Sequence, residues 1–323
     1  MNRILLRKCL AEVQLLFIAC ALLLFTFCWV RVFIVASLET SAFASIIDKL
    51  WENWGRFSPV PLSQLLSYSG RVAIAYDEPV VVFCIAIFAI ARGSAAVSGE
   101  LGRGTMEMLL AQPISRMQVL YSQAAVTVSC LALLCILSWL GTWSGIHTAE
   151  VTEQAPAKSI SIPLLDVRIP IPFGPREKIK IPMRERVTAS NFAPGALNLF
   201  CLGFCVAGVT TLASACDRYR WRTIGIVSCL FVLQMIFKVL GRAFDSTSFF
   251  EWITIFGAYE PQRLVYIAVD LPQYNWALSL PSIDGRPAMT GPLTYYITLV
   301  TIGTLGYLAA GVVFHRRDLP APL

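Results

Sequence analysis

The chain has 323 residues, of which 56% are hydrophobic and 14% are charged, with a formal net charge of +6. This apolar share and a mean hydropathy of +0.66 exclude an ordinary soluble globular domain, whose core needs fewer apolar side chains. The composition indicates an integral membrane protein.

Apolar runs long enough to cross a bilayer occur six times. A hydrocarbon layer of roughly 30 Å takes about 20 helical residues to span. Runs of that length with few or no charges lie at 14–37, 79–98, 119–146, 193–214, 223–242 and 292–314. A segment in lipid must satisfy its own backbone hydrogen bonds, and no ten-residue strand repeat is present. The expected fold is therefore an all-α integral membrane protein with six transmembrane helices in a single domain, 1–323.

The first run resembles a signal peptide in one respect only. Ala42-Phe43-Ala44 has the small residues of a cleavage site, but it lies well beyond the apolar part, which is itself longer than a signal core. We therefore expect the run to be a retained span.

Basic residues predict the orientation of the spans, since positive charge is retained on the cytoplasmic side. One set of connecting segments contains 11 Lys and Arg against 5 Asp and Glu: the N-terminus, 91–118, 217–222 and the tail after Phe314. The other set contains 12 against 15: 39–78, 146–192 and 243–291. Both termini are therefore expected in the cytoplasm and the three long loops outside, although 146–192 is itself slightly basic, with 7 against 5.

Several charged residues lie at or near the ends of the predicted spans. Residues 1–13 place basic side chains among apolar ones, which is typical of a short helix lying in the cytoplasmic interface. A simple positive anchor for the first span explains the same pattern. Arg31, Arg92 and Lys238 lie within about two turns of a span end, so we expect them to extend to the interface rather than to line a transport path. No acidic partner for them occurs within the predicted spans.

The three outer loops differ in pattern. Apolar residues between 46 and 57 follow the spacing of one helical face. Between 160 and 181, isoleucines and Val167 alternate with other residues and prolines interrupt, which predicts edge strands or extended chain in the outer loop 147–192, with a hairpin bent at Phe173-Gly174-Pro175. The pieces 249–258 and 263–271 are each too short to span and predict short helices.

Catalytic and metal-binding constellations are missing from the sequence. The two histidines, His147 and His315, lie on opposite sides of the membrane by this topology, so no histidine-based site can form. The ten cysteines fall in the spans or on the cytoplasmic side, without metal-site spacing, and we expect them to be packing residues. No Gly-x-x-x-x-Gly-Lys-Ser/Thr loop is present to hold ATP. We therefore expect no enzymatic site and no cofactor on this chain.

One glycine pair suggests close helix packing. Gly141 and Gly145, near the outer end of the third span, form a Gly-x-x-x-Gly motif that would allow two helices to approach closely. Such an approach would also permit dimerisation through this motif, although short motifs of this kind often occur by chance.

A polar stretch, 98–120, separates the second and third apolar runs. It contains Ser98-Gly99-Glu100, then Gly104-Thr105-x-Glu107-x-Leu109-Leu110, then Pro113-x-Ser115-Arg116. This stretch resembles the signature of the type-2 permeases of ABC exporters. The six-span layout with both termini inside agrees with that family along the whole chain, and 252–262 is similar to its segment between the last two spans.

The resemblance implies a role for the stretch. In the family it forms a cytoplasmic coupling helix, here within 99–118, that docks a soluble ATP-binding-cassette ATPase. The docking residues it implies are Glu100, Gly104, Thr105, Glu107, Leu109, Leu110, Pro113 and Arg116. Independently, Thr105 is placed to cap the helix that follows, and Glu107 lies favourably near its positive end. Leu109 and Leu110 would fill a groove on the partner. A capped interfacial helix that only anchors the loop is the simpler alternative.

The expected protein is the permease domain of an ATP-driven ABC exporter in the plasma (inner) membrane. ATP and Mg²⁺ would bind the partner ATPase, and a second permease, identical or related, would complete the membrane part; no nucleic acid is expected. One alternative is a non-transporting component of such a complex, acting on envelope assembly or motility through the outer loop. Another is an ATP-independent carrier, which the lack of buried carboxylates and inverted repeats disfavours. The sequence selects no substrate.

Overall fold

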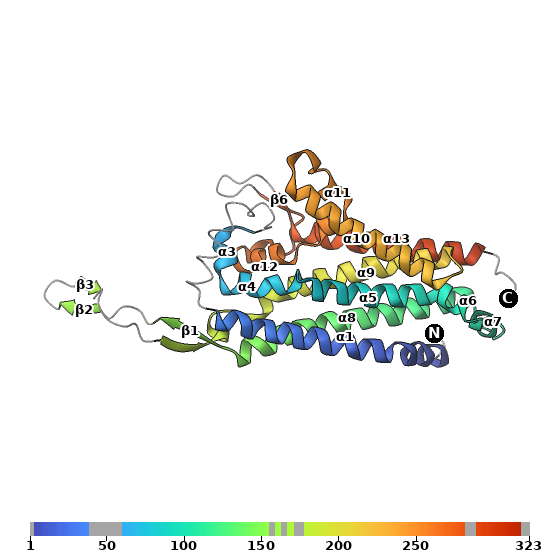
Figure 1. The fold of residues 1–323 in the computed structure, drawn as a ribbon, viewed down its shortest axis with the longest axis horizontal. Coiled ribbons are helices and arrows are strands. Elements are labelled where there is room, and N and C mark those ends of the chain that lie inside the picture. Colours follow the sequence, from blue (N-terminus) through green and yellow to red (C-terminus); the bar gives the residue numbers. More distant parts are fainter. Residues whose placement is uncertain are drawn as a thin grey trace.

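The computed structural model describes residues 3–38, 60–154, 159–162, 167–170, 178–281 and 289–317. Long helices run side by side along its longest axis (Figure 1). Five are single elements: α1 (Arg3–Ser37), α8 (Arg116–Thr148), α9 (Ala193–Cys216), α10 (Arg220–Ala243) and α13 (Pro292–Arg316). The remaining spanning unit, which is the second in chain order, extends from Tyr68 to Gly102. The predicted fold of six transmembrane helices is confirmed.

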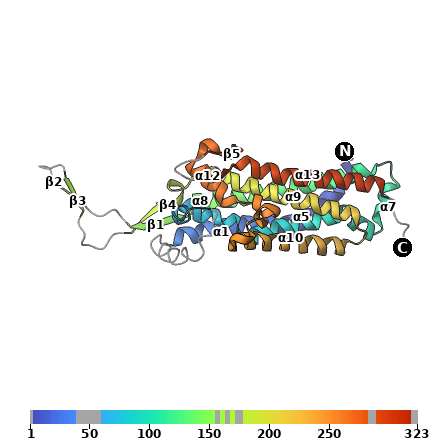
Figure 2. The same ribbon diagram turned by 90° about the horizontal axis from the view of Figure 1, so that it is seen from above.

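The two ends of the bundle differ. The short helix α7 (Thr105–Leu110) lies at one end, where α1 begins and α13 ends (Figures 1 and 2). We call this the α7 end. A β-hairpin extends from the opposite end, the hairpin end (Figure 2).

The second spanning unit is a composite. It consists of α4 (Tyr68–Ala73), η2 (Ile74–Tyr76), α5 (Pro79–Ser94), the π-helical turn η3 (Ala95–Gly99) and α6 (Glu100–Gly102). Pro79 at the first turn of α5 lacks an N–H that would be unpaired there, so the helix restarts at this residue. The π turn shifts the register of the chain directly before Glu100. The predicted span 79–98 covers only the middle of this unit.

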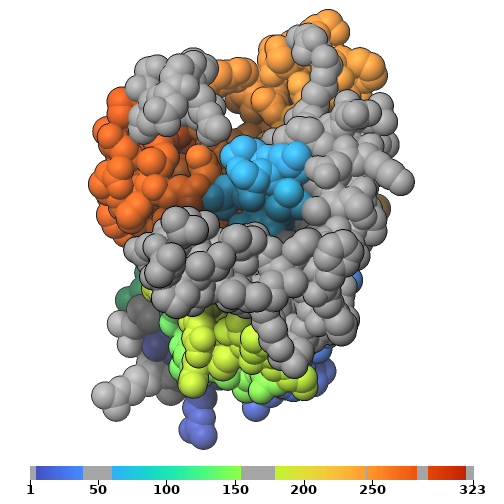
Figure 3. Space-filling model, turned by 90° about the vertical axis from the view of Figure 1, so that its left-hand side faces the viewer, coloured from blue at the N-terminus to red at the C-terminus, as the bar shows by residue number. Residues whose placement is uncertain are grey.

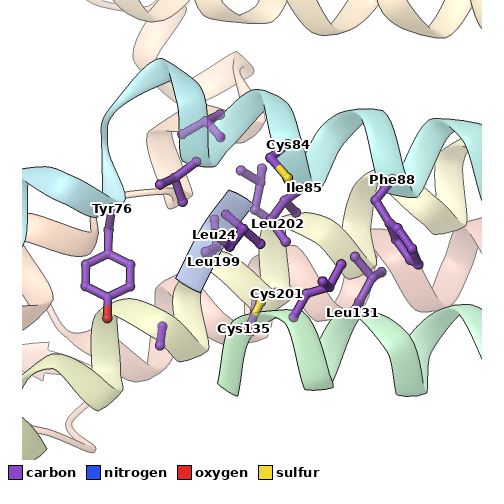
Figure 4. Packing of buried hydrophobic residues seen from close by; sticks show 14 of the residues in the cluster. Leu24, Tyr76, Cys84, Ile85, Phe88, Leu131, Cys135, Leu199, Cys201 and Leu202 are labelled. Atoms are coloured by element: carbon purple, nitrogen blue, oxygen red, sulfur yellow. The ribbon is translucent and has the colours of Figure 1, made fainter. Parts of the chain in front are cut away.

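Apolar side chains from four spans meet in the centre of the bundle. Leu24 of α1, Ile85 of α5, Leu131 of α8 and Leu199 of α9 are all fully buried and point toward one another (Figure 4). Buried cysteines fill gaps between them, and all ten cysteines are free thiols. The bundle is held by this apolar packing.

Glycines bring pairs of spans into close contact. In α9, a Cβ on Gly208 would lie 2.3 Å from the carbonyl oxygen of Gly303 in α13. The predicted pair Gly141 and Gly145 faces α1, where an added Cβ would lie 2.5 Å from the Phe25 carbonyl oxygen and 2.6 Å from Val32 Cβ, respectively. The motif is thus used within the chain, which contradicts the prediction that it forms a dimer contact.

The segment after α8 forms antiparallel strands. β1 (Glu150–Gln154) pairs with β4 (Lys178–Pro182), and β2 (Ser159–Ile162) pairs with β3 (Val167–Pro170). The Ile162↔Val167 pairing places the reversal of the chain between these two residues. The bend predicted at 173–175 is therefore not the hairpin turn, and those residues lie outside the described part of the chain.

Short helices cover the hairpin end. They are α3 (Leu62–Leu66), η4 (Met183–Glu185), η5 (Ala189–Phe192), η6 (Asp245–Thr247), α11 (Phe250–Ile253), η7 (Ile255–Ala258), α12 (Pro261–Asp270) and η8 (Pro272–Tyr274), with the strand pair β5 (Ser279–Leu280) and β6 (Met289–Thr290). Short helices predicted in 249–271 are present. The helical face predicted within 46–57 lies outside the described residues. At the other end of the chain α1 is one continuous helix, so 3–13 form no separate interfacial helix.

Candidate functional site

The polar stretch between the second and third spans folds into a compact turn at the α7 end. α6 ends at Gly102, the chain reverses through Arg103 and Gly104, and α7 follows. Gly104 has φ +68°, a left-handed conformation that favours glycine. The turn therefore depends on Gly104, one of the residues predicted for the site.

A buried carboxylate lies at the centre of this turn. The Glu100 side chain is fully buried and accepts hydrogen bonds from Lys8 Nζ at 3.0 and 3.1 Å and from Arg103 at 2.9 Å. Thr105 donates a further hydrogen bond to the same carboxylate. Glu12 lies at the rim, 3.6 Å from Lys8 and 3.9 Å from Arg103. These bonds compensate the loss of hydration of Glu100 and attach the turn to α1.

The prediction that Thr105 caps α7 is wrong. The residue before α7 is Gly104, and no side chain caps the helix there. Thr105 is instead the first helical residue, and its hydroxyl is engaged by the carboxylate and the backbone carbonyl of Glu100. The strong acceptor at Glu100 therefore outcompetes a backbone N–H for this hydroxyl.

The two faces of α7 have different environments. Met106 is fully buried against Leu120, Phe314 and neighbouring residues. Leu109 and Leu110 are half-buried and pack against the chain's own core, so the prediction that they remain free to fill a partner's groove is only partly met. The side chains that α7 exposes are Glu107 and Met108, and Met108 is 71% exposed.

The return to α8 is also tied to the bundle. Pro113 lies exposed in the turn, and Ser115 caps α8 in a reciprocal pair with Gln118. The Arg116 guanidinium donates to the backbone carbonyl oxygen of Arg317 at 2.7 Å. Arg317 in turn donates to the carbonyl oxygen of Ala215 at 2.8 Å. Arg116 thus connects the turn to α13 and, through Arg317, to the end of α9.

A hydroxyl cluster attaches the end of the second span to α9 and α10. Ser214 Oγ accepts the Ser98 N–H at 2.9 Å and lies 3.0 Å from Ser98 Oγ. Thr223 Oγ1 of α10 lies 3.3 Å from Ser98 Oγ. Sequence reasoning missed Lys8, Ser214 and Arg317, because each lies far along the chain from the motif and is one of many similar residues.

Three charged residues expected to extend to the interface have partners in the structure. Arg31 lies 3.3 Å from the Glu78 carboxylate, and Lys238 lies 2.9 Å from Glu260. Arg92 is buried and donates to Gln123 at 2.5 Å. Arg92 therefore does not extend to the interface, and the acidic partners of the other two come from turns beyond the predicted spans.

A small effect is expected from Gly104→Ala. The added Cβ meets open space, so the cost is that of the left-handed backbone alone, about 1 kcal/mol. We expect a slightly lower midpoint of unfolding in detergent and faster trypsin cleavage at Arg103. Gly102→Ala is the matched control, since Gly102 is equally open and no positive φ is recorded for it. Equal behaviour of the two variants would contradict the role of Gly104.

The fold and this turn define a polytopic helical membrane protein with a structured connection between its second and third spans. Compared with known families, residues 13–146 match the model described as ABC-2 family transporter protein. A comparison with curated proteins gave no match. The family match contains most of α1, the whole polar stretch and nearly all of α8, and it confirms the resemblance indicated by the motifs. A part of the chain shorter than half is therefore similar to the ABC-2 family of transporters.

Proposed function

We propose that this chain is the permease of an ATP-driven exporter and that a separate soluble ATPase docks on the exposed face of α7. The observation that carries the proposal is the pair Glu107 and Met108, exposed on a helix whose other face is fixed to the bundle. An apolar side chain beside a charge is a suitable anchor for a groove on a partner. The α7 end then faces the cytoplasm.

The contacts of the turn support transmission of force. Glu100 connects it to α1, Arg116 connects it to α13, and Ser98 connects it to α9. A displacement of α7 therefore reaches three spans through direct polar contacts. The energy source would be ATP with Mg²⁺ on the partner, since the sequence contains no phosphate-binding loop of its own. A second permease would complete the membrane part in the inner membrane.

Two charge-changing variants test the docking surface. We expect Met108→Asp and Glu107→Lys each to reduce about tenfold the ATPase activity that copurifies with the tagged chain from its native membrane, because a lost anchor at an interface costs more than about 1.4 kcal/mol. Ile179→Asp is the control, since Ile179 is 45% exposed on the hairpin at the opposite end. Undiminished recovery with both α7 variants, or no ATPase with the unchanged chain, would overturn the proposal.

The hairpin arm supports a second candidate, a non-transporting component that acts on envelope assembly. β1 and β4 pair through Gln154↔Lys178, so Asn-Gly can replace 155–177 and close the hairpin. Under the exporter proposal the shortened chain should still support ATP-driven transport and complement a strain that lacks the gene. Loss of complementation with normal ATPase recovery would favour the second candidate.

A further inference from the structure

A polar cleft opens at the hairpin end, beside the ends of α10 and α11 and the start of α13. Its volume is about 310 Å³, and its lining includes Arg242, Glu251, Arg263, Thr294, Tyr295 and Thr298. Figure 3 shows this end of the molecule, with the surface recessed between the orange residues of the two sides. The cleft lies at the opposite end of the bundle from α7, so it is separate from the docking surface.

Most of the charges in the cleft are paired with one another. Glu260 Oε1 accepts from Lys238 at 2.9 Å and from Arg242. Glu251 Oε1 accepts from Arg242 Nε at 2.9 Å. Two cations and two carboxylates therefore compensate each other. Asp77 lines a neighbouring cleft of about 250 Å³, which shares Lys238, Arg242 and Glu260 with the first cleft.

Arg263 is the remaining charge in the lining. Among the residues that the structure describes, no carboxylate lies within ion-pair distance of it, and its guanidinium lies 5.7 Å from the centre of the Tyr295 ring. Among the described residues, Arg263 is thus the cation of the lining that has no carboxylate partner. Its planar guanidinium can bind phosphate or carboxylate through two hydrogen bonds, so it suits an anionic group on a ligand.

Hydrogen bonds connect the residues at the floor of the cleft. Thr254 Oγ1 donates to the Gln234 carbonyl oxygen at 2.8 Å, and Lys238 Nζ donates to the Tyr259 carbonyl oxygen at 2.8 Å. The buried Asn198 accepts the Glu260 N–H at 3.0 Å and donates to the Ala258 carbonyl oxygen at 3.1 Å. A ligand would therefore meet a preformed site, which reduces the entropy lost on binding.

Exposed apolar side chains lie on the segment that borders one side of the cleft. Trp252, which also lines the cleft, is 88% exposed, and Phe244, Phe249 and Ile253 are each more than half exposed. α10 presents further exposed apolar residues on the turns that precede Phe244, including Ile236 and Val239. The ligand that matches both features has a compact anionic headgroup joined to apolar chains.

We propose that the cleft binds the phosphodiester headgroup of a membrane lipid in the leaflet at the hairpin end. Arg263 would hold the phosphate, the hydroxyls of Thr294 and Thr298 would face the glycerol or headgroup alcohol, and the acyl chains would lie along α10. The site requires neither an ATPase nor transport, so it can fail or succeed independently of the proposed function.

The test measures stabilisation of the purified chain in an uncharged detergent. Dihexanoylphosphatidylglycerol should raise the unfolding temperature in a saturable manner, whereas dihexanoylglycerol, which has the same chains without phosphate, should not. Arg263→Gln should weaken binding about tenfold, because it removes a charge-assisted pair. Arg222→Gln is the control, since Arg222 is exposed at the α7 end.

Three results would overturn the proposal. They are equal binding by the Arg263→Gln variant, equal stabilisation by dihexanoylglycerol, and full stabilisation by sodium phosphate alone, which would indicate a free anion rather than a lipid. If the Arg263→Gln variant is unstable without lipid, Arg263→Lys provides the second measurement. It keeps the charge but loses the two-point contact, so weaker binding with an unchanged unfolding temperature in detergent alone is expected.

Discussion

We expect Gly208→Ala to cause a large loss of stability for a single added methyl group. The new Cβ would lie 2.3 Å from the Gly303 carbonyl oxygen and 2.9 Å from Gly303 Cα, and backbone atoms cannot rotate away as a side chain can. α9 and α13 must therefore separate, with an expected cost of about 3 kcal/mol in the free energy of unfolding. Titration with a denaturing detergent, followed by helical circular dichroism, measures the change.

The matched control is Gly225→Ala in α10. An added Cβ there meets nothing within 4 Å, so the same chemical change should be neutral or stabilising by up to about 1 kcal/mol, through the higher helix propensity of alanine. If both variants unfold at the same denaturant concentration, the close approach of α9 and α13 is not a determinant of stability.

The second large effect is expected for Glu100→Gln. The substitution removes the negative charge that Lys8 and Arg103 share and leaves two cations facing a neutral amide in a buried position. Because Lys8 and Arg103 are 33% and 43% exposed, they can turn toward water, and we expect a cost of about 2 kcal/mol rather than the larger cost of a fully buried pair. The turn should also detach from α1.

Two measurements separate these consequences. The unfolding midpoint reports stability, and the rate of trypsin cleavage at Arg103 in the folded protein reports detachment of the turn. Glu12→Gln is the control, since Glu12 lies at the rim of the same cluster, at 3.6 and 3.9 Å from the cations, and should change both quantities little. If trypsin cleaves the Glu100→Gln variant at Arg103 no faster than it cleaves the unchanged chain, the carboxylate does not hold the turn.

The number of spans was predictable from the sequence because apolar length alone determines it. The exact bounds were not, since they depend on partners from elsewhere. α1 begins at Arg3 and not near 14, and one reason is that Lys8 finds a buried carboxylate 92 positions away. The motif identified Glu100 and Gly104 as site residues. The position of Thr105 before the expected helix predicted a helix cap, whereas the hydrogen bond of its hydroxyl to Glu100 depends on the three-dimensional fold.

The sequence also could not show which helix the Gly-x-x-x-Gly motif contacts. Gly141 and Gly145 predicted a close helix contact, and the structure contains one, but with α1 of the same chain. The acidic partners of the charged residues near the span ends could not be predicted either. Glu78 and Glu260 lie outside the predicted spans, so the ion pairs they form with Arg31 and Lys238 could not be inferred from the composition of the spans.

Two ion pairs join α1 to the second spanning unit. Lys8 and Arg31 of α1 bind Glu100, at the start of α6, and Glu78, directly before α5, within the second spanning unit. About 35 Å of helix separates the two pairs at 1.5 Å per residue, close to the thickness of a hydrocarbon layer. With both pairs formed, sliding or rotation of these two helices against each other requires one pair to break. They should move as a single rod, which leaves α10, the least buried span, as the element free to shift beside it.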